Sequence, residues 1–107
     1  MKITTLNKNY DFQRVYKKGK SYVTPSFVIY IRKNNKQGIR LGFTVSKKIG
    51  NAVIRNRSKR RLREIFRASF NPKLTELDVV VVARSRSKNE NFSKMIQDMS
   101  NIFMGIE

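Results

Sequence analysis

Cysteine and histidine are both absent from the sequence, and the two absences exclude much of the chemistry that proteins use. Without a thiolate or an imidazole, the chain has no thiol nucleophile, no imidazole base and no ordinary zinc site. No disulfide can hold the fold, and residues 1–20 contain no apolar leader segment, so we expect a cytoplasmic protein. No apolar run approaches the roughly 18 residues that a membrane helix needs, so we expect no membrane partner.

Acidic residues are scarce: seven Asp and Glu stand against 24 Lys and Arg. They are scattered, and only Glu76 and Asp78 lie close together, where turn chemistry at the start of a strand explains them. A two-metal nuclease needs carboxylates that converge on ions about 4 Å apart. We therefore expect no catalytic residue in the protein, no metal or other cofactor bound by the protein alone, and no small-molecule substrate.

Positive charge, by contrast, is abundant, with a formal net charge of +17 over 107 residues. So much self-repulsion exceeds what solubility requires and is typical of a protein that binds a polyanion. Hydrophobic residues still make up 39% of the chain, so it should fold. Its length fits a single domain over residues 1–107.

Hydrophobic periodicity predicts six elements in the order α-β-β-α-β-α. The helices are expected over residues 9–18, 52–69 and 92–104, and the strands over residues 27–32, 39–46 and 77–83. Asn9 is predicted to cap the first helix and Gly19 to end it, and Asn71-Pro72 should end the second. One sheet packed with helices, a two-layer α+β sandwich, is the natural architecture for this order.

The strand patterns also predict how the sheet is arranged. The polar residues 33–38 are typical of a hairpin loop, so the strands on either side should pair antiparallel. Residues 77–83, with four successive valines, predict a strand buried on both faces and parallel to a neighbour. The connection from residue 39 to residue 84 would by default cross over in the right-handed sense.

The most informative segment spans residues 46–67, where two lysines and a tight turn lead into a basic helix. Gly50 allows the turn, and Asn51 can cap the helix. Glu64 is the only acid in this segment, and its clear i, i+4 partner is Arg60. A solvated basic face is the alternative interpretation, but the preponderance of Arg, whose fork fits phosphate, favours binding of a phosphate chain. The stripe opposite the apolar side carries Asn56, Lys59, Arg60, Arg63 and Arg67.

On these residues the sequence resembles the protein subunit of bacterial ribonuclease P. The resemblance covers nearly the whole chain, from residues 8–16 through residues 41–48 to residues 78–84. It is most specific in the Arg55-Asn56-Arg57 core. That core follows the run Ser-Lys-Lys-Ile-Gly-Asn-Ala-Val and precedes Lys59-Arg60 and Arg63-Glu64.

The resemblance implies a subunit that is inactive alone and that binds a catalytic RNA, which with its Mg²⁺ removes the 5′ leader of precursor tRNA. It also implies a left-handed crossover between the last two strands. The residues implied to contact the catalytic RNA are Lys47, Lys48, Asn51, Arg55, Asn56, Arg57, Lys59, Arg60, Arg63 and Arg67. Those implied to line a cleft for the single-stranded leader, between the first helix and the sheet, are Phe12, Tyr16, Lys17, Ser21, Tyr30 and Arg40.

The residue pattern supports such a cleft independently of the resemblance. Phe12 and Tyr16 share one helix face, and Tyr30 alternates with apolar residues on its strand. Aromatic rings beside Lys and Arg form a platform for single strands, worth about 1–3 kcal/mol per stacked base. For Phe12 and Tyr30, core packing is the alternative. Two other functions stay open: a ribosomal-protein-like RNA-binding module or RNA chaperone, which would not aid processing, and a nuclease acting alone.

Overall fold

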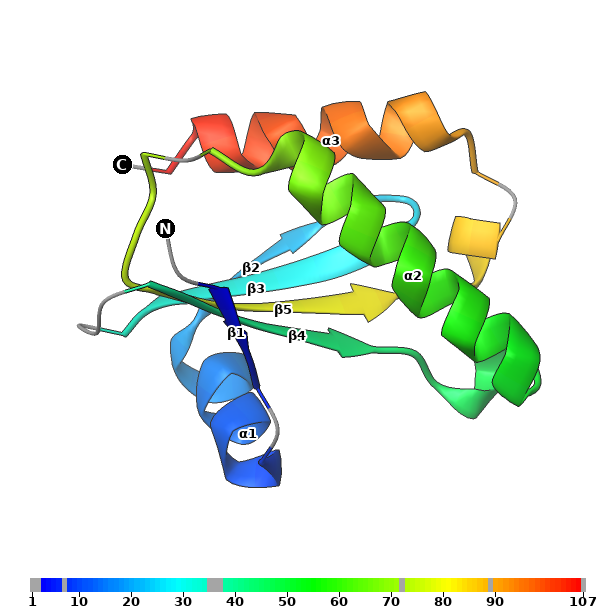
Figure 1. Cartoon of the computed structure of the whole chain (residues 1–107), viewed down its shortest axis with the longest axis horizontal. Helices are drawn as coiled ribbons and strands as arrows, with labels where there is room; N and C mark the ends of the chain where they lie inside the picture. Colours follow the sequence, from blue (N-terminus) through cyan, green and yellow to red (C-terminus); the bar gives the residue numbers. More distant parts are fainter. Residues whose placement is uncertain (1–2, 7, 35–37, 72, 89, 107) are drawn as a thin grey trace.

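The computed structural model describes residues 3–6, 8–34, 38–71, 73–88 and 90–106. They form one five-stranded sheet with α2 and α3 packed on one face and α1 on the other (Figure 1). The strands are β1 (Ile3–Thr5), β2 (Lys20–Val23), β3 (Phe27–Lys33), β4 (Ile39–Thr44) and β5 (Leu77–Ala83). The helices are α1 (Asn9–Lys18), α2 (Ala52–Ser69) and α3 (Phe92–Met104), and short 3₁₀ turns span Lys47–Ile49 and Ser85–Lys88.

The predicted α+β class and the order of its six main elements are confirmed, with α1 adding a partial layer on the second sheet face. The three helices have the predicted bounds, because each carries a clear apolar stripe at helical spacing. Pro72, part of the predicted stop after α2, lies outside the described residues. The sequence does not predict the short edge strands β1 and β2. Their residues are largely exposed, so neither shows the apolar alternation that identifies a strand.

The predicted hairpin between β3 and β4 is wrong, because β5 lies between these two strands. The strand order is β1-β4-β5-β3-β2. β5 is antiparallel to β3, with Val28 opposite Val82, and parallel to β4, with Leu41 opposite Val79. The valine run explains this placement, since a central strand covered on both faces buries nearly all its side chains, as β5 does. Residues 35–37 of the predicted loop lie outside the described residues.

The connection from β4 through α2 to β5 crosses over in the left-handed sense, as the resemblance implies (Figure 1). The right-handed default is wrong for this chain because the two sheet faces differ in chemistry. The sheet face that α2 covers presents Leu41 and Val79. The opposite face, on which α1 packs, presents Arg40 and Asp78 at the neighbouring positions. A right-handed connection would place the apolar side of α2 on those charged groups.

The helix caps follow the sequence in part. Asn51 caps α2 as predicted, because its side-chain oxygen accepts a hydrogen bond of 3.0 Å from a backbone amide of the first turn. Asn9 does not cap α1: the helix begins at Asn9 itself, and Lys8 takes the cap position without a side-chain bond. Gly19 follows α1 as predicted, and its amide donates to the carbonyl of Val15 at 2.8 Å.

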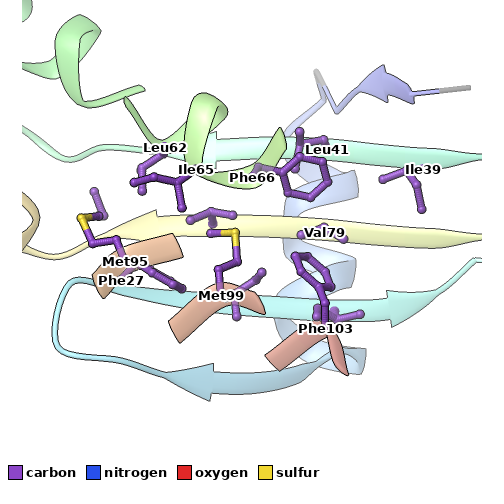
Figure 2. Close-up of a cluster of buried hydrophobic side chains, with 14 of the residues drawn as sticks. Phe27, Ile39, Leu41, Leu62, Ile65, Phe66, Val79, Met95, Met99 and Phe103 are labelled. Atoms are coloured by element: carbon purple, nitrogen blue, oxygen red, sulfur yellow. The ribbon is translucent and has the colours of Figure 1, made fainter. Parts of the chain in front are cut away.

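The main hydrophobic core lies between the sheet and the pair formed by α2 and α3 (Figure 2). Phe92, the first residue of α3, is exposed, and the guanidinium of Arg61 lies 5.6 Å from its ring centre. None of the helices in the described part of the chain combines the length and the apolar character that crossing a bilayer requires. The helical members of the core, all almost fully buried, are Leu62, Ile65, Phe66, Met95, Met99 and Phe103.

Candidate RNA-binding surfaces

The sheet face under α1, here called the α1 face, is only partly covered. Val15 of α1 is fully buried together with Val80 of β5, whereas Val82 further along the same strand stays partly exposed. Gly42 on β4 admits the ring of Phe12, because a Cβ at residue 42 would lie 2.7 Å from the ring carbons. The missing side chain therefore lets α1 approach the sheet closely, while the far end of the face stays open.

Three of the predicted cleft residues come together on the α1 face. The rings of Tyr16 from α1 and Tyr30 from β3 meet edge to face with their centroids 4.9 Å apart, and Phe12 lies 6.5 Å from Tyr16. The hydroxyl oxygens of Tyr16 and Thr44 are 3.1 Å apart and share a hydrogen bond. All three rings pack on buried aliphatic side chains and remain partly exposed. Core packing therefore accounts for one side of each ring and leaves the other accessible.

Two more predicted cleft residues lie near these rings. Ser21 on β2 is directly opposite Tyr30 in the strand register, so its exposed side chain shares the face of that ring. Lys17 is exposed on the last turn of α1, next to Tyr16 in the sequence. The structure thus adds a hydroxyl beside the aromatic pair and a cation at the end of the helix that carries Tyr16.

Arg40, the sixth residue of the predicted cleft, is bound to carboxylates. Its guanidinium donates two hydrogen bonds of 2.7 Å to Asp78 and lies 3.6 Å from an oxygen of Asp11. The fully buried Asp78 also accepts hydrogen bonds from Asn34 at 2.8 Å and from Arg32 at 3.5 Å. We call these five residues the Asp78 network. Because it joins α1 to three strands, Arg40 holds the helix on the sheet.

Sequence reasoning missed the Asp78 network because it explained Asp78, together with Glu76, by turn chemistry at the start of the strand. Glu76 does lie in the bend before β5, with a positive φ of 61°, but Asp78 lies inside β5. In the register, Asp78 stands opposite both Arg32 on β3 and Arg40 on β4. A single acid within an apolar run is a signal that could have identified it, because a buried charge is almost always paired.

The electrostatics of the network keep Asp78 ionised. Burial raises the pKa of Asp78, but the hydrogen bonds from Arg40 and Asn34 and the positive charges around it outweigh burial, so the pKa lies below its usual value. The hydrogen bond to Asp78 raises the pKa of Arg40 in turn. Arg40 therefore stays positively charged between Asp11 and Asp78. Among the residues that the structure describes, no group of three or more acidic side chains comes together that could hold a metal ion.

The outer side of α2 carries cations without acidic partners. Arg60 does not make the expected pair with Glu64, and neither side chain joins any of the ion pairs found among the described residues. Arg55 is half-buried, whereas Arg61 donates to the backbone carbonyl of Glu90. The exposed members of the predicted RNA-binding set on this helix are Asn56, Arg57, Lys59, Arg60, Arg63 and Arg67.

The remaining predicted residues precede α2. Lys47 and Lys48 are exposed in the 3₁₀ turn, and Gly50 joins this turn to the helix. A Cβ at residue 50 would lie 2.9 Å from the side chain of Ile54, so glycine allows the turn to fold back on α2. The two lysines therefore lie near a helix N-terminus, which itself attracts anions. Asn51 uses its side-chain oxygen for the cap, which leaves its amide group as the donor for any ligand.

Comparisons with known proteins agree with this geometry. The family model described as Ribonuclease P matches residues 1–107. The ribonuclease P protein component of Natranaerobius thermophilus is 43% identical over 93 residues, which are 86% of this chain and 80% of that protein. The solved ribonuclease P protein of Staphylococcus aureus superposes with a TM-score of 0.81 at 38% identity, covering 96% of this chain and 94% of that one. For the protein from Thermotoga maritima the TM-score is 0.79, the identity 33%, and the coverage 96% and 97%. The chain thus belongs to the ribonuclease P family, the RNA-binding protein components of a tRNA-processing ribonuclease.

Proposed function

We propose that this chain is the protein subunit of a cytoplasmic ribonuclease P ribonucleoprotein. In this proposal α2 and the lysine turn bind the catalytic RNA, and the α1 face binds the 5′ leader of precursor tRNA. The observation that carries the proposal is the separation of two kinds of cation. The exposed cations of α2 have no acidic partner in the part of the chain that the structure describes, whereas Arg32 and Arg40 converge on Asp78 under α1. Cations without acidic partners remain available to phosphates.

The α2 surface suits a structured RNA because its spacing is fixed. The apolar side of the helix is anchored in the core, so the opposite side presents its guanidinium groups at regular helical intervals. If five or six of the groups contact phosphates, the logarithm of the association constant should fall against the logarithm of salt concentration with a slope of roughly −4 to −5. Lys47 and Lys48 extend this surface to the helix N-terminus.

The α1 face suits a single strand because its aromatic rings can stack on bases of any sequence. Tyr16 and Tyr30 supply the rings, Ser21 a hydroxyl, and Lys17 a charge for a phosphate. Arg40 has a different part in the proposal. Its guanidinium is held by Asp78 and Asp11, so it acts as a positioning residue that fixes α1, and with it the Tyr16 ring, over the sheet.

In this proposal hydrolysis belongs to the RNA partner and its Mg²⁺. The described residues do not fit a metal site of the protein's own, because the two carboxylates that converge, Asp11 and Asp78, share Arg40. The protein contributes by neutralising phosphate charge and by holding the leader. Both effects should allow the ribonucleoprotein to work at lower Mg²⁺ than the RNA alone requires.

The experiment that tests the proposal is cleavage of a precursor tRNA at low Mg²⁺ by a bacterial ribonuclease P RNA, with and without this protein. We expect the protein to restore cleavage at the mature 5′ end and to be inactive alone. An Arg60→Ala, Arg63→Ala double variant should require more protein for the same rate, and Lys94→Ala should match the wild type. Lys94 is the matched control, because it is exposed but already paired with Asp98 at 3.1 Å.

The same assay separates the other functions. A protein that binds both RNAs but leaves the cleavage rate unchanged would be an RNA-binding module or chaperone. A protein that cleaves in Mg²⁺ without the RNA would be a nuclease. Either result contradicts the proposal.

A further inference from the structure

A groove of about 560 Å³ lies at the β4 edge of the sheet, between β1 and α2. It exists because β1 is short. The last pair in the β1–β4 register is Thr5 with Leu41, and the chain then leaves the sheet after Leu6 donates its amide to the Leu41 carbonyl at 3.0 Å. From Gly42 onward, no strand formed by the described residues pairs with this edge of β4, and α2 overhangs the opening.

The chemistry of the groove is cationic on one wall and aromatic on its floor. Lys59, Arg63 and Arg67 line it from α2 at intervals of four residues, so they point to the same side of the helix. The ring of Phe43, half-buried on β4, lies under the guanidinium of Arg63 at 5.8 Å from its centre, and Phe66 closes the inner end. None of the described residues that line the groove is acidic.

We infer that this groove receives one unstacked nucleotide of the RNA partner. The base lies against the Phe43 ring with the Arg63 guanidinium beside it, and Lys59 and Arg67 hold its phosphate. Aromatic rings and guanidinium planes are the groups on which proteins stack splayed-out RNA bases, and a neighbouring cation wall suits the phosphate. The volume is within the range of pockets that enclose small ligands.

The inference rests on the proposed function and adds a different kind of recognition to it. Phosphate contacts along α2 would accept any RNA of suitable shape, whereas a pocket for one base requires an unpaired nucleotide at a fixed place. Lys59 and Arg63 belong to the same exposed stripe as Arg60, so an RNA chain bound along α2 passes the mouth of the groove. This continuity favours a nucleotide within an RNA chain over a free nucleotide.

The first test is the affinity of variants for a bacterial ribonuclease P RNA at fixed salt. Phe43→Leu keeps an apolar side chain against the core but removes the ring, and it should weaken binding roughly 5- to 100-fold, the range expected for one stacked base. Arg63→Lys keeps the charge but not the planar group, and it should also weaken binding. Lys94→Ala should bind as the wild type does. An unchanged melting temperature of the Phe43→Leu protein shows that any loss comes from the groove.

The second test uses the absence of cysteine, which makes any introduced thiol unique. A photoactivatable group on Thr4→Cys, at the wall of the groove, should cross-link to one unpaired nucleotide of the RNA, and Phe43→Leu should abolish that cross-link. Asn101→Cys on α3 is the control and should not give this product.

The outcomes distinguish the groove from the function on which it rests. If Phe43→Leu is folded and binds like the wild type, or the Thr4 cross-links spread along paired regions, the groove assignment is wrong. If Arg60→Ala still weakens binding in that case, the proposed function stands without the groove. A wild-type protein that does not bind the RNA would overturn both.

Discussion

Two groups of arginines in this protein have opposite surroundings. Under α1, Arg32 and Arg40 converge on the buried carboxylate of Asp78. Along α2, the exposed arginines have no acidic partner among the described residues; they are Arg57, Arg60, Arg63 and Arg67. The sequence contains the same side chain in both places, and only the tertiary structure separates them. A paired arginine in this fold holds the structure together, and an unpaired one is available to RNA.

The difference also explains why the charge is tolerated. The α1 region places its cations on acids that strand pairing brings together, with Asp78 opposite Arg32 on one side and Arg40 on the other. No acid among the described residues pairs with the exposed cations of α2, so these cations repel each other until a polyanion neutralises them. The predictions below test this division, from the largest expected effect to the smallest.

Removing the charge at the centre of the α1 region should have the largest effect on stability. In Asp78→Asn, the guanidinium groups of Arg32 and Arg40 keep their charges and lose the Asp78 carboxylate, while Asp11 remains near Arg40. Breaking a buried ion pair in this way costs about 3 kcal/mol. Chemical denaturation of the variant should show this loss in the free energy of unfolding. Asp98→Asn, which breaks a surface pair on α3, should change it by less than about 1 kcal/mol. Equal effects would contradict the role of the network.

Lowering the pH should reduce the free energy of unfolding by less than the Asp78→Asn substitution does. The pKa of Asp78 is lower in the folded protein than its unfolded value of about 3.9, because Arg40 and Asn34 bind the ionised form. The ionised group therefore stabilises the fold above that pH, and the contribution is lost as pH falls through the folded pKa. Unfolding free energies measured between neutral pH and about pH 3 should decline, and Asp78→Asn should decline less steeply. Parallel curves would refute the linkage.

Truncating the aromatic pair should weaken binding of leader-bearing substrate by about 2 kcal/mol. The variant is Tyr30→Ala, which removes one ring of the pair with Tyr16. Tyr30→Phe keeps the ring and should bind nearly as well as the wild type. Affinities for precursor and mature tRNA, measured with the reconstituted ribonucleoprotein, separate the effects, because mature tRNA has no leader. If both substrates lose affinity equally, the leader assignment fails.

Truncating one arginine of α2 should have the smallest effect on the fold. Arg60→Ala removes an exposed group that pairs with no acid in the described parts of the chain, so the free energy of unfolding should change by less than about 0.5 kcal/mol. Thermal melts of the free protein test this directly. A loss comparable to that of Asp78→Asn would mean that Arg60 is structural and that the division between the two regions is wrong.

The sequence predicts the parts of the fold that depend on local periodicity. All three helices follow from their apolar stripes, and the buried valine run identifies β5 as a central strand. Local pattern cannot show that β5 inserts between β3 and β4, because that pairing depends on which strands meet across a long connection. The crossover hand was set by the charged residues on one sheet face, which local rules do not consider.

The candidate site likewise has features that the sequence predicts and features that depend on tertiary structure. Helical spacing is enough to predict that Phe12 and Tyr16 lie together and that Arg60 and Arg63 share an outward stripe. Spacing along one chain cannot show that Arg40 meets Asp78, since the two are 38 residues apart and become neighbours only through β4–β5 pairing. Arg40 was therefore placed among the ligand-binding residues, although its guanidinium is bound by carboxylates.

The most direct test of the central claim is the salt dependence of binding to a bacterial ribonuclease P RNA. Association constants for the wild type, Arg60→Ala and Lys94→Ala should be measured over a series of salt concentrations. We expect a log–log slope of roughly −4 to −5 for the wild type and for Lys94→Ala, and a slope shallower by about 1 for Arg60→Ala. Identical slopes for the three proteins would contradict the claim that the unpaired cations of α2 bind RNA phosphates.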